Sequence, residues 1–328
     1  MKSLFLYTTP HYSHKTLADK LEITDSLQTH RGGLCGIPLF GKMISSQIIQ
    51  SKIKKFAPDV ILTESLTHDL LAAYFYKRKH PKTKIIAIAA DPKLYYLKDS
   101  FDIDQILTNA SLQSVDWFLC SGRQMQDLLP ENKKKSSTVF YPKLNYTPND
   151  YMPKFSNKND FYFVGSLVKS KGIQQLNNYF VNSNKELIVY GDGPEKYKLH
   201  NQIKFRGYNI APHEMALDEC VFNISLALFE PFGLAAIEAM LFGFIPIVTK
   251  NCGNKEFVEL VNKNLVINSP KEISSAQLEI IKDEQTFKDY SKKCKQIAAD
   301  YIKQSMLSYE KCYLDTRMMV FHHFLYKR

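Results

Sequence analysis

The sequence is poor in cysteine and lacks the patterns through which cysteine usually builds structural sites. Its 328 residues include six cysteines, with no Cys-x-x-Cys pair and no histidine at metal-binding spacing from them. This absence excludes a zinc site of the usual kind and a disulfide framework, and it favours a reducing compartment.

Long hydrophobic runs are absent as well. The apolar run 4–7 is too short for a signal peptide, and no segment reaches membrane-spanning length. We therefore expect a cytoplasmic protein.

Charge is in modest excess. The net charge of +10 includes basic clusters at 52–55, 77–80 and 133–135, which are typical of solvated helix ends and turns. Because the clusters share the first half of the chain, peripheral contact with an anionic membrane surface stays open. No helix-turn-helix, OB or RNA-recognition motif accompanies them, so no nucleic-acid partner is expected.

The dominant pattern is an alternation of short apolar strands with helical stretches. In the first half, strands are predicted at 3–9, 59–64, 84–90, 116–121 and 138–141, with helices near 41–56, 66–79, 101–114 and 122–129. Several of these strands are apolar throughout, as strands buried on both faces should be. The alternation therefore predicts an α/β fold with a parallel sheet and crossover helices.

A Pro- and Asn-rich segment at 143–159 interrupts the alternation and is predicted to be an interdomain linker. Strands then follow at 160–167, 186–191, 203–207, 221–228, 245–249 and 265–267, with helices near 171–182, 195–201, 233–242, 254–262 and 284–312. We predict two doubly wound Rossmann-like domains that face a cleft, with ligands at the carboxyl ends of the strands. The predicted parts are an N-terminal domain at 1–145, a C-terminal domain at 160–310 and a tail at 311–328.

The most informative stretch is 230–238. An apolar strand ends just before Glu230, and a helix-forming run begins at about Gly233. The Glu230 carboxylate is therefore expected in the cleft, and the amides of Phe232, Gly233 and Leu234 open a helix N-terminus that suits a phosphate. Glu238 lies about a turn and a half into this helix, where it could reach a hydroxyl of the same ligand. The plain alternative is a strand–loop–helix unit with a surface and a capping glutamate.

Three blocks resemble a known family. EPFGLAAIEAMLFGFIPIVTKNCGNKEFV, with seven residues between Glu230 and Glu238, resembles the E-x7-E region of the group 1 glycosyltransferases, which are retaining nucleotide-sugar enzymes of the GT-B fold. FYFVGSLVKSKGIQQL (161–176) and LIVYGDGPEKYKL (187–199) resemble that family's "VGRL…KG" and "GDGP" blocks. The resemblance is strong from about 160 to 262. It implies sugar transfer from a nucleoside-diphosphate sugar to an acceptor hydroxyl, with retention and without a metal, in glycan or glycolipid synthesis.

The resemblance also implies roles for individual residues. Glu230 would contact the donor sugar, and Lys171 would bind the diphosphate; these two form the expected catalytic pair. Glu238 would hold the ribose hydroxyls, and Tyr208 falls where the nucleobase usually lies. The whole expected donor-binding set is Gly165, Ser166, Tyr208, Phe232, Gly233, Leu234 and Glu238. The GDGP turn is expected to be structural, and no cofactor is expected beyond the nucleotide sugar as co-substrate.

The sequence departs from the family pattern in two places. Ser166 stands where the family has a diphosphate-binding Arg, and Lys169 is the candidate substitute. Asp91 lies where many relatives have a His near the transferred sugar, so it either takes part of that role or caps the strand. Gly33, in the Arg31-Gly32-Gly33 turn, is a candidate for the loop that faces the donor.

Other readings stay open. The departures favour a weak or inactive partner subunit with the same fold, and a nucleotide-sugar epimerase is a second alternative. The acceptor could be a glycan, a lipid-linked molecule or a small molecule. The tail is expected to pack back on the N-terminal domain, with a dip into a membrane interface as the alternative.

Overall fold

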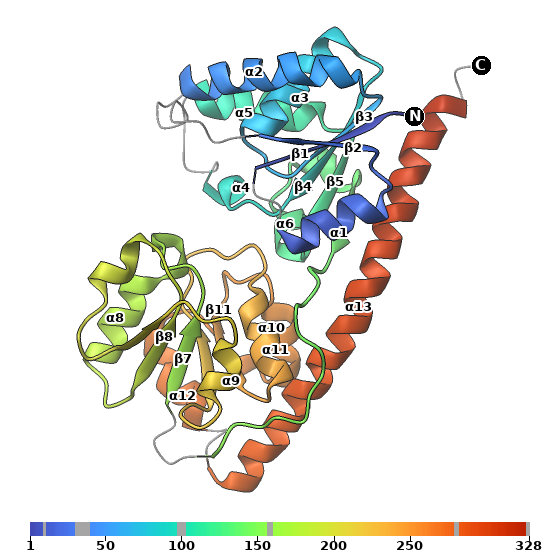
Figure 1. Ribbon diagram of the computed structural model, residues 1–328. Helices are drawn as coiled ribbons and strands as arrows, with labels where there is room; N and C mark the ends of the chain where they lie inside the picture. The colour runs from blue at the N-terminus through green and yellow to red at the C-terminus, as the bar shows by residue number, and fades with distance from the viewer. Residues whose placement is uncertain (9–10, 30–39, 97–102, 156–159, 279–281, 326–328) are drawn as a thin grey trace. The chain divides into compact units, whose positions relative to one another are not determined.

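The computed structural model describes residues 1–8, 11–29, 40–96, 103–155, 160–278 and 282–325. The chain divides into two compact units (Figure 1). Unit 1 comprises Met1–Lys143 and Ser305–Arg328, and unit 2 comprises Leu144–Gln304. None of the helices in the described ranges is long and apolar enough to cross a membrane.

Unit 1 is built on a six-stranded parallel sheet in the order β2-β1-β3-β4-β5-β6. Its strands are β1 (Ser3–Tyr7), β2 (Asp25–Gln28), β3 (Val60–Thr63), β4 (Lys84–Ala89), β5 (Trp117–Ser121) and β6 (Ser137–Phe140). Its helices before the linker are α1 (Tyr12–Lys20), α2 (Phe40–Phe56), α3 (His68–Lys79), α4 (Lys93–Tyr96), α5 (Ile103–Ser114), α6 (Arg123–Asp127) and α7 (Glu131–Lys134).

Strand β2 and helices α1, α4 and α7 are additions to the predicted elements of unit 1. β2 lies at the sheet edge, and three of its four residues are exposed, so the apolar pattern that marks the other strands is missing from it. β3 shows the opposite case, because all four of its residues are buried. A fully buried parallel strand carries a continuous apolar signal, whereas a solvated edge strand does not.

Unit 2 contains a second six-stranded parallel sheet, in the order β12-β11-β10-β7-β8-β9. Its strands are β7 (Phe161–Val164), β8 (Leu187–Tyr190), β9 (Lys204–Gly207), β10 (Phe222–Ser225), β11 (Ile245–Thr249) and β12 (Val266–Ile267). Its helices are α8 (Ile173–Val181), α9 (Pro212–Ala216), α10 (Leu234–Leu241), α11 (Lys255–Val261), α12 (Ile273–Leu278) and α13 (Glu284–Leu325), with 3-10 turns η3 (Lys169–Lys171), η4 (Pro194–Lys198), η5 (Lys263–Leu265) and η6 (Pro270–Glu272).

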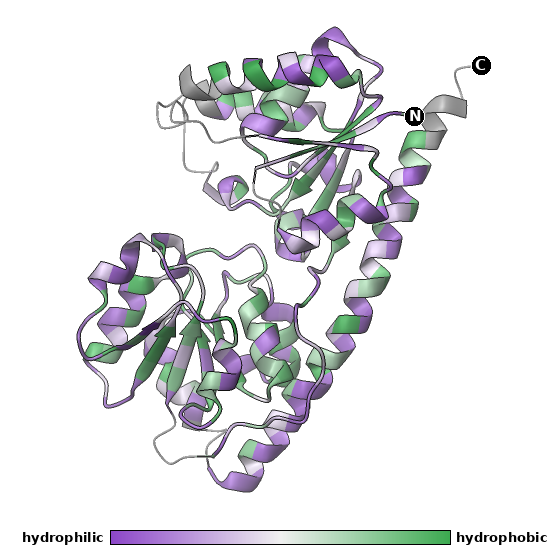
Figure 2. Cartoon of the chain, viewed as in Figure 1, coloured by the Kyte–Doolittle hydropathy of each residue, from purple (hydrophilic) through white to green (hydrophobic). Residues whose placement is uncertain are grey.

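The core of each unit follows the hydropathy of its elements. Figure 2 shows hydrophobic strands inside the units and helices that carry hydrophobic and hydrophilic residues. Helix α10 is the most apolar of the short helices of unit 2, and it buries Ile237, Met240 and Leu241. Burying side chains of this size stabilises a fold by about 1.5–3 kcal/mol each. This packing fixes the position of the α10 N-terminus.

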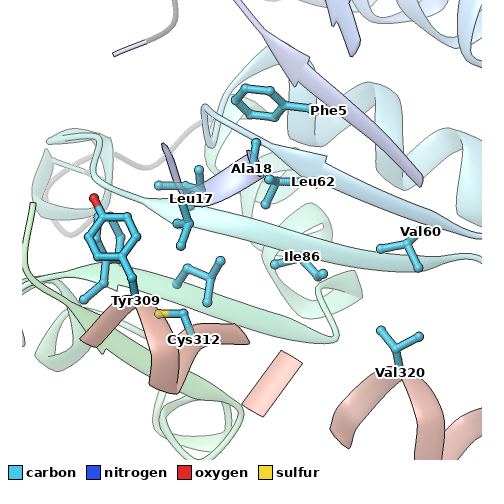
Figure 3. Close-up of a cluster of buried hydrophobic side chains, with 12 residues drawn as sticks. Phe5, Leu17, Ala18, Val60, Leu62, Ile86, Tyr309, Cys312 and Val320 are labelled. Atoms are coloured by element: carbon cyan, nitrogen blue, oxygen red, sulfur yellow. The ribbon is translucent and has the colours of Figure 1, made fainter. Parts of the chain in front are cut away.

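Helix α13 continues past the predicted end at 312, and its residues from Ser305 onward belong to unit 1. Figure 3 shows Tyr309, Cys312 and Val320 of this helix turned toward side chains of the unit 1 strands. They are buried in one hydrophobic cluster with residues of β1, β3 and β4. The Tyr309 hydroxyl also donates a hydrogen bond to the carbonyl oxygen of Ser13, at 3.1 Å. The tail is thus part of the unit 1 core.

The segment between the units lies on unit 2. Its residues 144–155 contain no helix or strand. The Lys154 amide donates to the Leu217 carbonyl at 2.9 Å, and the Tyr151 ring stacks on Phe242 with 5.8 Å between ring centroids. The predicted linker is therefore anchored along this part of its length.

The topology of unit 2 determines where a ligand site can form. The chain passes from β7 to β8 on one side and later returns to place β10 on the other side of β7. Such a switch point separates the two loops that leave neighbouring strands, and it opens a crevice at their carboxyl ends. In this unit those loops follow β7 and β10, and they carry Lys171 and Glu230.

Candidate active site

Lys171 and Glu230 meet at the switch point of unit 2. The Lys171 ammonium donates a hydrogen bond to Oε2 of Glu230 and forms an ion pair with it. The Glu230 side chain is 12% exposed and that of Lys171 is 27% exposed. The pair therefore lies half-buried, where it is screened less by solvent than a surface pair.

Gly172 explains how the two loops come so close. It adopts a left-handed conformation with φ +74°, and a Cβ at this position would lie 1.9 Å from the carbonyl oxygen of Leu226. The Leu228 amide also donates to the Ser170 carbonyl at 2.9 Å, which joins the loops by backbone. Only glycine permits both the positive φ and the close approach.

The backbone of Glu230 is fixed by the loop after β11. Its amide donates to the Asn251 carbonyl at 3.1 Å, and its carbonyl accepts from the Gly253 amide at 3.0 Å. These bonds form an isolated parallel bridge between Glu230 and Cys252. The carboxylate therefore projects from a backbone that has little freedom to move.

Gly233 turns the chain into helix α10. It has φ +89°, and a Cβ there would approach the Glu230 side chain to 3.0 Å and the Asn254 side-chain nitrogen to 2.8 Å. The Asn254 side chain donates to the Gly233 carbonyl at 2.5 Å. Phe232 is buried, and Leu234 begins the helix. The first amides of α10 have no partners within the helix, which suits them to an anion.

Glu238 lies on α10 and is 14% exposed. Its Oε2 is 3.6 Å from Nε2 of His213, a residue of α9 whose side chain is 1% exposed. His213 Nδ1 pairs with the Tyr162 hydroxyl at 2.8 Å. Sequence reasoning missed His213 and Tyr162 because an isolated histidine and a strand tyrosine carry no local signal of a shared role.

A pocket of about 280 Å³ lies at the carboxyl ends of β7, β8 and β9. The predicted residues Gly165, Ser166 and Tyr208 all line it. The complete lining is Val164, Gly165, Ser166, Tyr190, Gly191, Asp192, Tyr208 and Asn209. Two residues of the GDGP turn, expected to be structural, thus also face this hollow. Lys171, Glu230 and Glu238 are not among its lining residues.

The position of Ser166 leaves room for a substitute cation. Ser166 is exposed, and its carbonyl accepts from the Val168 amide at 3.0 Å. Lys169 begins the same 3-10 turn that ends in Lys171 and is also exposed. Two ammonium groups therefore stand on one short turn beside the pocket. Lys169 stays the candidate substitute for the family's arginine, although an ammonium lacks the bidentate geometry of a guanidinium.

Of the two N-terminal candidates, Asp91 lies within the described residues. Asp91 accepts a hydrogen bond from the Lys93 amide at 2.9 Å and so caps α4. The contact caps the start of a helix rather than the preceding strand, and it involves one carboxylate oxygen. Gly33 lies outside the described residues.

Unit 1 has a polar cluster of its own at the carboxyl ends of β1 and β3. Glu64 accepts from the Thr8 amide at 3.1 Å, from the His11 amide at 3.0 Å and from His14 Nδ1 at 3.1 Å. Burial alone would raise the pKa of Glu64, but the hydrogen bonds from His14 and the two amides outweigh it and lower the pKa. Glu64 directly follows an apolar strand, so the reasoning applied to Glu230 would also have found it.

Asp69 lies beside this cluster and is fully buried. Burial raises its pKa, although His68 and hydroxyl hydrogen bonds act in the opposite direction. Its Oδ1 is 3.3 Å from His68 Nε2. Asp69 lies in the first turn of α3. Like Glu64, it follows β3 at the carboxyl end of the sheet, where open α/β folds collect ligands.

Metal-binding groups do not gather in the described residues. No group of three or more His, Cys, Asp or Glu side chains there could hold a metal ion. Five cysteines, at 120, 220, 252, 294 and 312, are buried and free. Burial raises the pKa of each thiol, to about 12 for Cys312. These thiols stay protonated near neutral pH and make poor ligands or nucleophiles.

Residues 151–299, which lie within unit 2, match the family described as glycosyl transferases group 1. The chain is a glycosyltransferase, and its unit 2 is similar to that family. A curated relative, an uncharacterized glycosyltransferase of Methanocaldococcus jannaschii, is 22% identical over 292 residues, covering 78% of this chain and 74% of the relative. The predicted enzyme class is thereby confirmed.

Solved structures with low sequence identity share the fold of this glycosyltransferase. HepE of Anabaena in complex with UDP has a TM-score of 0.63 at 16% identity, with 95% of this chain and 98% of that chain covered. Sucrose-phosphate synthase of Thermosynechococcus elongatus has 0.71 at 14% identity, with both chains fully covered. WaaG, a glycosyltransferase involved in lipopolysaccharide biosynthesis, has 0.68 at 12%, covering 96% and 99%. These similarities and the two parallel sheets confirm the predicted α/β class with two Rossmann-like units.

Proposed function

We propose that this glycosyltransferase takes its sugar from a nucleoside diphosphate bound to unit 2 and transfers it to an acceptor hydroxyl. The observation that carries the proposal is the Lys171–Glu230 pair at the switch point of the sheet, beside the N-terminus of α10. A cation, a carboxylate and the N-terminus of a helix in one half-buried place suit a ligand with a diphosphate at one end and a sugar at the other.

The proposed chemistry depends on charge at the leaving group. When the glycosidic bond breaks, negative charge develops on the diphosphate, and Lys171 with the first amides of α10 stabilises it. Glu230 faces the sugar, where positive charge develops in an oxocarbenium-like state. Glu238 holds the ribose hydroxyls, and the pocket beside Tyr208 receives the nucleobase. Because Lys171 supplies the cation, the proposed reaction uses no divalent metal, and activity should survive EDTA.

UDP is the first nucleotide to test. HepE is described in complexes with UDP, with UDP-glucose, and with UDP and glucose. Titration calorimetry should show that this protein binds UDP, and binding should weaken in the Lys171→Met variant. If no common nucleoside diphosphate binds the folded protein, the donor site is wrong, and the inactive-partner alternative gains support.

Turnover distinguishes the remaining alternatives. A glycosyltransferase releases UDP from UDP-glucose in proportion to glycoside formed on an added acceptor, whereas an epimerase converts the sugar nucleotide without releasing UDP. The assay should sample a glycan, a lipid-linked and a small-molecule acceptor. Retention at the anomeric carbon is also proposed, and the proton NMR coupling of the first-formed product would decide it.

A basic surface of unit 1 supports a second, peripheral interaction. A shallow pocket of about 780 Å³ lies where α2 and α3 end, and its lining includes Lys54, Lys79, His80 and Lys82, with Asp59 as its carboxylate. Lys77 belongs to the same basic cluster of the sequence, but its ammonium pairs with Asp116 at 2.5 Å. We propose that the exposed lysines bring this otherwise cytoplasmic protein to an anionic membrane surface.

Vesicle co-sedimentation tests the membrane proposal. Replacing Lys54, Lys79 and Lys82 by glutamate should reduce binding to vesicles that contain anionic lipid by at least about tenfold. Vesicles of neutral lipid and a Lys288→Glu variant on α13 serve as controls. Binding of the triple variant to anionic vesicles at the wild-type level would contradict the proposal.

A further inference from the structure

His213 is a buried histidine with one polar atom left over. Its Nδ1 is 2.8 Å from the Tyr162 hydroxyl, while its Nε2 has no hydrogen-bond partner in the part of the chain that the structure describes. The side chain is only 1% exposed, so water does not readily satisfy this nitrogen. Buried polar groups of this kind are rare in folded proteins and usually have a reason.

The unpaired nitrogen faces Glu238. The distance of 3.6 Å between Nε2 and Oε2 is within ion-pair range but too long for a hydrogen bond. A carboxylate only accepts, so the favourable arrangement places the proton on Nε2 and leaves Nδ1 to accept from Tyr162. Burial raises the pKa of Tyr162 well above its usual value, so this hydroxyl keeps its proton and donates.

The imidazole has little freedom to turn away from Glu238. It stacks on Phe242 with 5.5 Å between ring centroids, and Tyr146 meets it edge-on at the same centroid distance. Tyr162 is fully buried in β7, and Glu238 lies on the well-packed helix α10. Each of the three groups is therefore held by a different packed element: Tyr162 by β7, His213 by α9 and Glu238 by α10.

We propose that His213 is a positioning residue of the donor site: when a nucleoside diphosphate binds, its Nε2–H closes the gap to Oε2 of Glu238 and donates a hydrogen bond, so that the other carboxylate oxygen faces the ribose hydroxyls. This inference rests on the proposed function of unit 2. It extends the proposed site to α9. This helix directly follows the loop that carries Tyr208 and Asn209, two residues that line the pocket. The Asn209 side chain accepts from the Ala211 amide at 2.8 Å and thereby ties this loop to the start of α9.

The test compares UDP with 2′,3′-dideoxy-UDP, which lacks both ribose hydroxyls. Hydroxyls bound by a carboxylate should make the wild type prefer UDP by about 10–100-fold in Kd, as charge-assisted hydrogen bonds do. In His213→Phe, which keeps the ring stack but loses both nitrogens, this preference should fall to about threefold or less. Binding of the dideoxy analogue should change little. A merely structural defect would weaken both ligands equally and leave their ratio unchanged.

The variant panel separates positioning from folding. His213→Phe leaves the Tyr162 hydroxyl buried without its acceptor, so the double variant Tyr162→Phe/His213→Phe removes both members of the pair and should show the same loss of preference. Glu238→Gln sets the reference for a defective carboxylate. Tyr290→Phe removes a hydroxyl that accepts from Asn262 at 3.0 Å elsewhere in unit 2, and it should keep the wild-type ratio.

The possible failures are distinguishable. A wild-type preference that persists in both His213 variants overturns the positioning role and leaves the donor site intact. A wild type that binds UDP without preferring it over the dideoxy analogue overturns this inference and the ribose role of Glu238, but leaves the diphosphate site at Lys171 standing. If UDP does not bind, the comparison is repeated with GDP, ADP and CDP and their dideoxy analogues. If none of these nucleotides binds, the donor site and this inference are both refuted.

Discussion

Lys171 and Glu230, 59 positions apart in the chain, form an ion pair that joins the loops after the neighbouring strands β7 and β10. Each of the two charged side chains is thus paired with an opposite charge of the protein itself. A diphosphate that binds Lys171 competes with Glu230 for the ammonium and frees the carboxylate to face the sugar. The two residues should therefore respond differently to substitution.

Replacing Glu230 by Gln should reduce kcat by about 100-fold or more, while the Kd for UDP changes by less than about threefold. The carboxylate is needed when charge develops in the transition state, and UDP lacks the sugar that Glu230 faces. Steady-state kinetics and calorimetry measure the two effects separately. Loss of UDP affinity in parallel with kcat would assign Glu230 to nucleotide binding instead.

Replacing Lys171 by Met should weaken UDP binding by about 10–100-fold and lower turnover as well, because the ammonium binds the diphosphate in both states. Lys288→Met, which removes a lysine paired with Glu284 on α13 at 2.8 Å, is the matched control and should bind UDP normally. Unchanged affinity in Lys171→Met would remove Lys171 from the donor site. Lys169→Met then tests whether the neighbouring lysine binds the diphosphate.

Glu64→Gln should destabilise unit 1 by about 1–3 kcal/mol near neutral pH, because the carboxylate accepts three hydrogen bonds there. Its pKa is lowered in the folded state. The stabilisation is therefore complete above the ordinary carboxyl pKa and is lost as the pH falls through the lower, folded pKa. Melting temperatures of the two proteins should differ near neutral pH and converge as the pH falls through the lowered pKa of the folded state.

The exposed Glu22 supplies the control for that experiment, since its side chain is 67% exposed. Glu22→Gln should melt like the wild type at each pH. A Glu64→Gln difference that grows on acidification would reverse the sign and contradict the assigned hydrogen bonds.

The buried thiols provide a test of the core and of the helix α13 tail. In a Cys35→Ser background, the native protein should react with none of its five remaining thiols, and the denatured protein with all five. Burial raises the pKa of Cys312 to about 12, so its thiol stays protonated as well as inaccessible near neutral pH. A colorimetric thiol assay measures this, and rapid native labelling at Cys312 would show that the tail leaves unit 1.

The apolar strands and the local motifs could be read from the sequence, because each is a property of consecutive residues. Buried strands such as β3 carry an unbroken apolar signal, whereas the exposed edge strand β2 carries none and was missed. The helix start at Gly233 was recognisable because an apolar strand, a glycine and a helix-forming run follow one another there.

Long-range relationships depended on the tertiary structure, because no local pattern records which loops meet. The sequence by itself determined the α/β alternation and the two glutamates with seven residues between them. The sheet order brought Lys171 to Glu230, and the packing of α9 against β7 and α10 brought His213 between Tyr162 and Glu238. Strand order and side-chain packing are global free-energy choices, so these contacts became visible only in the folded chain.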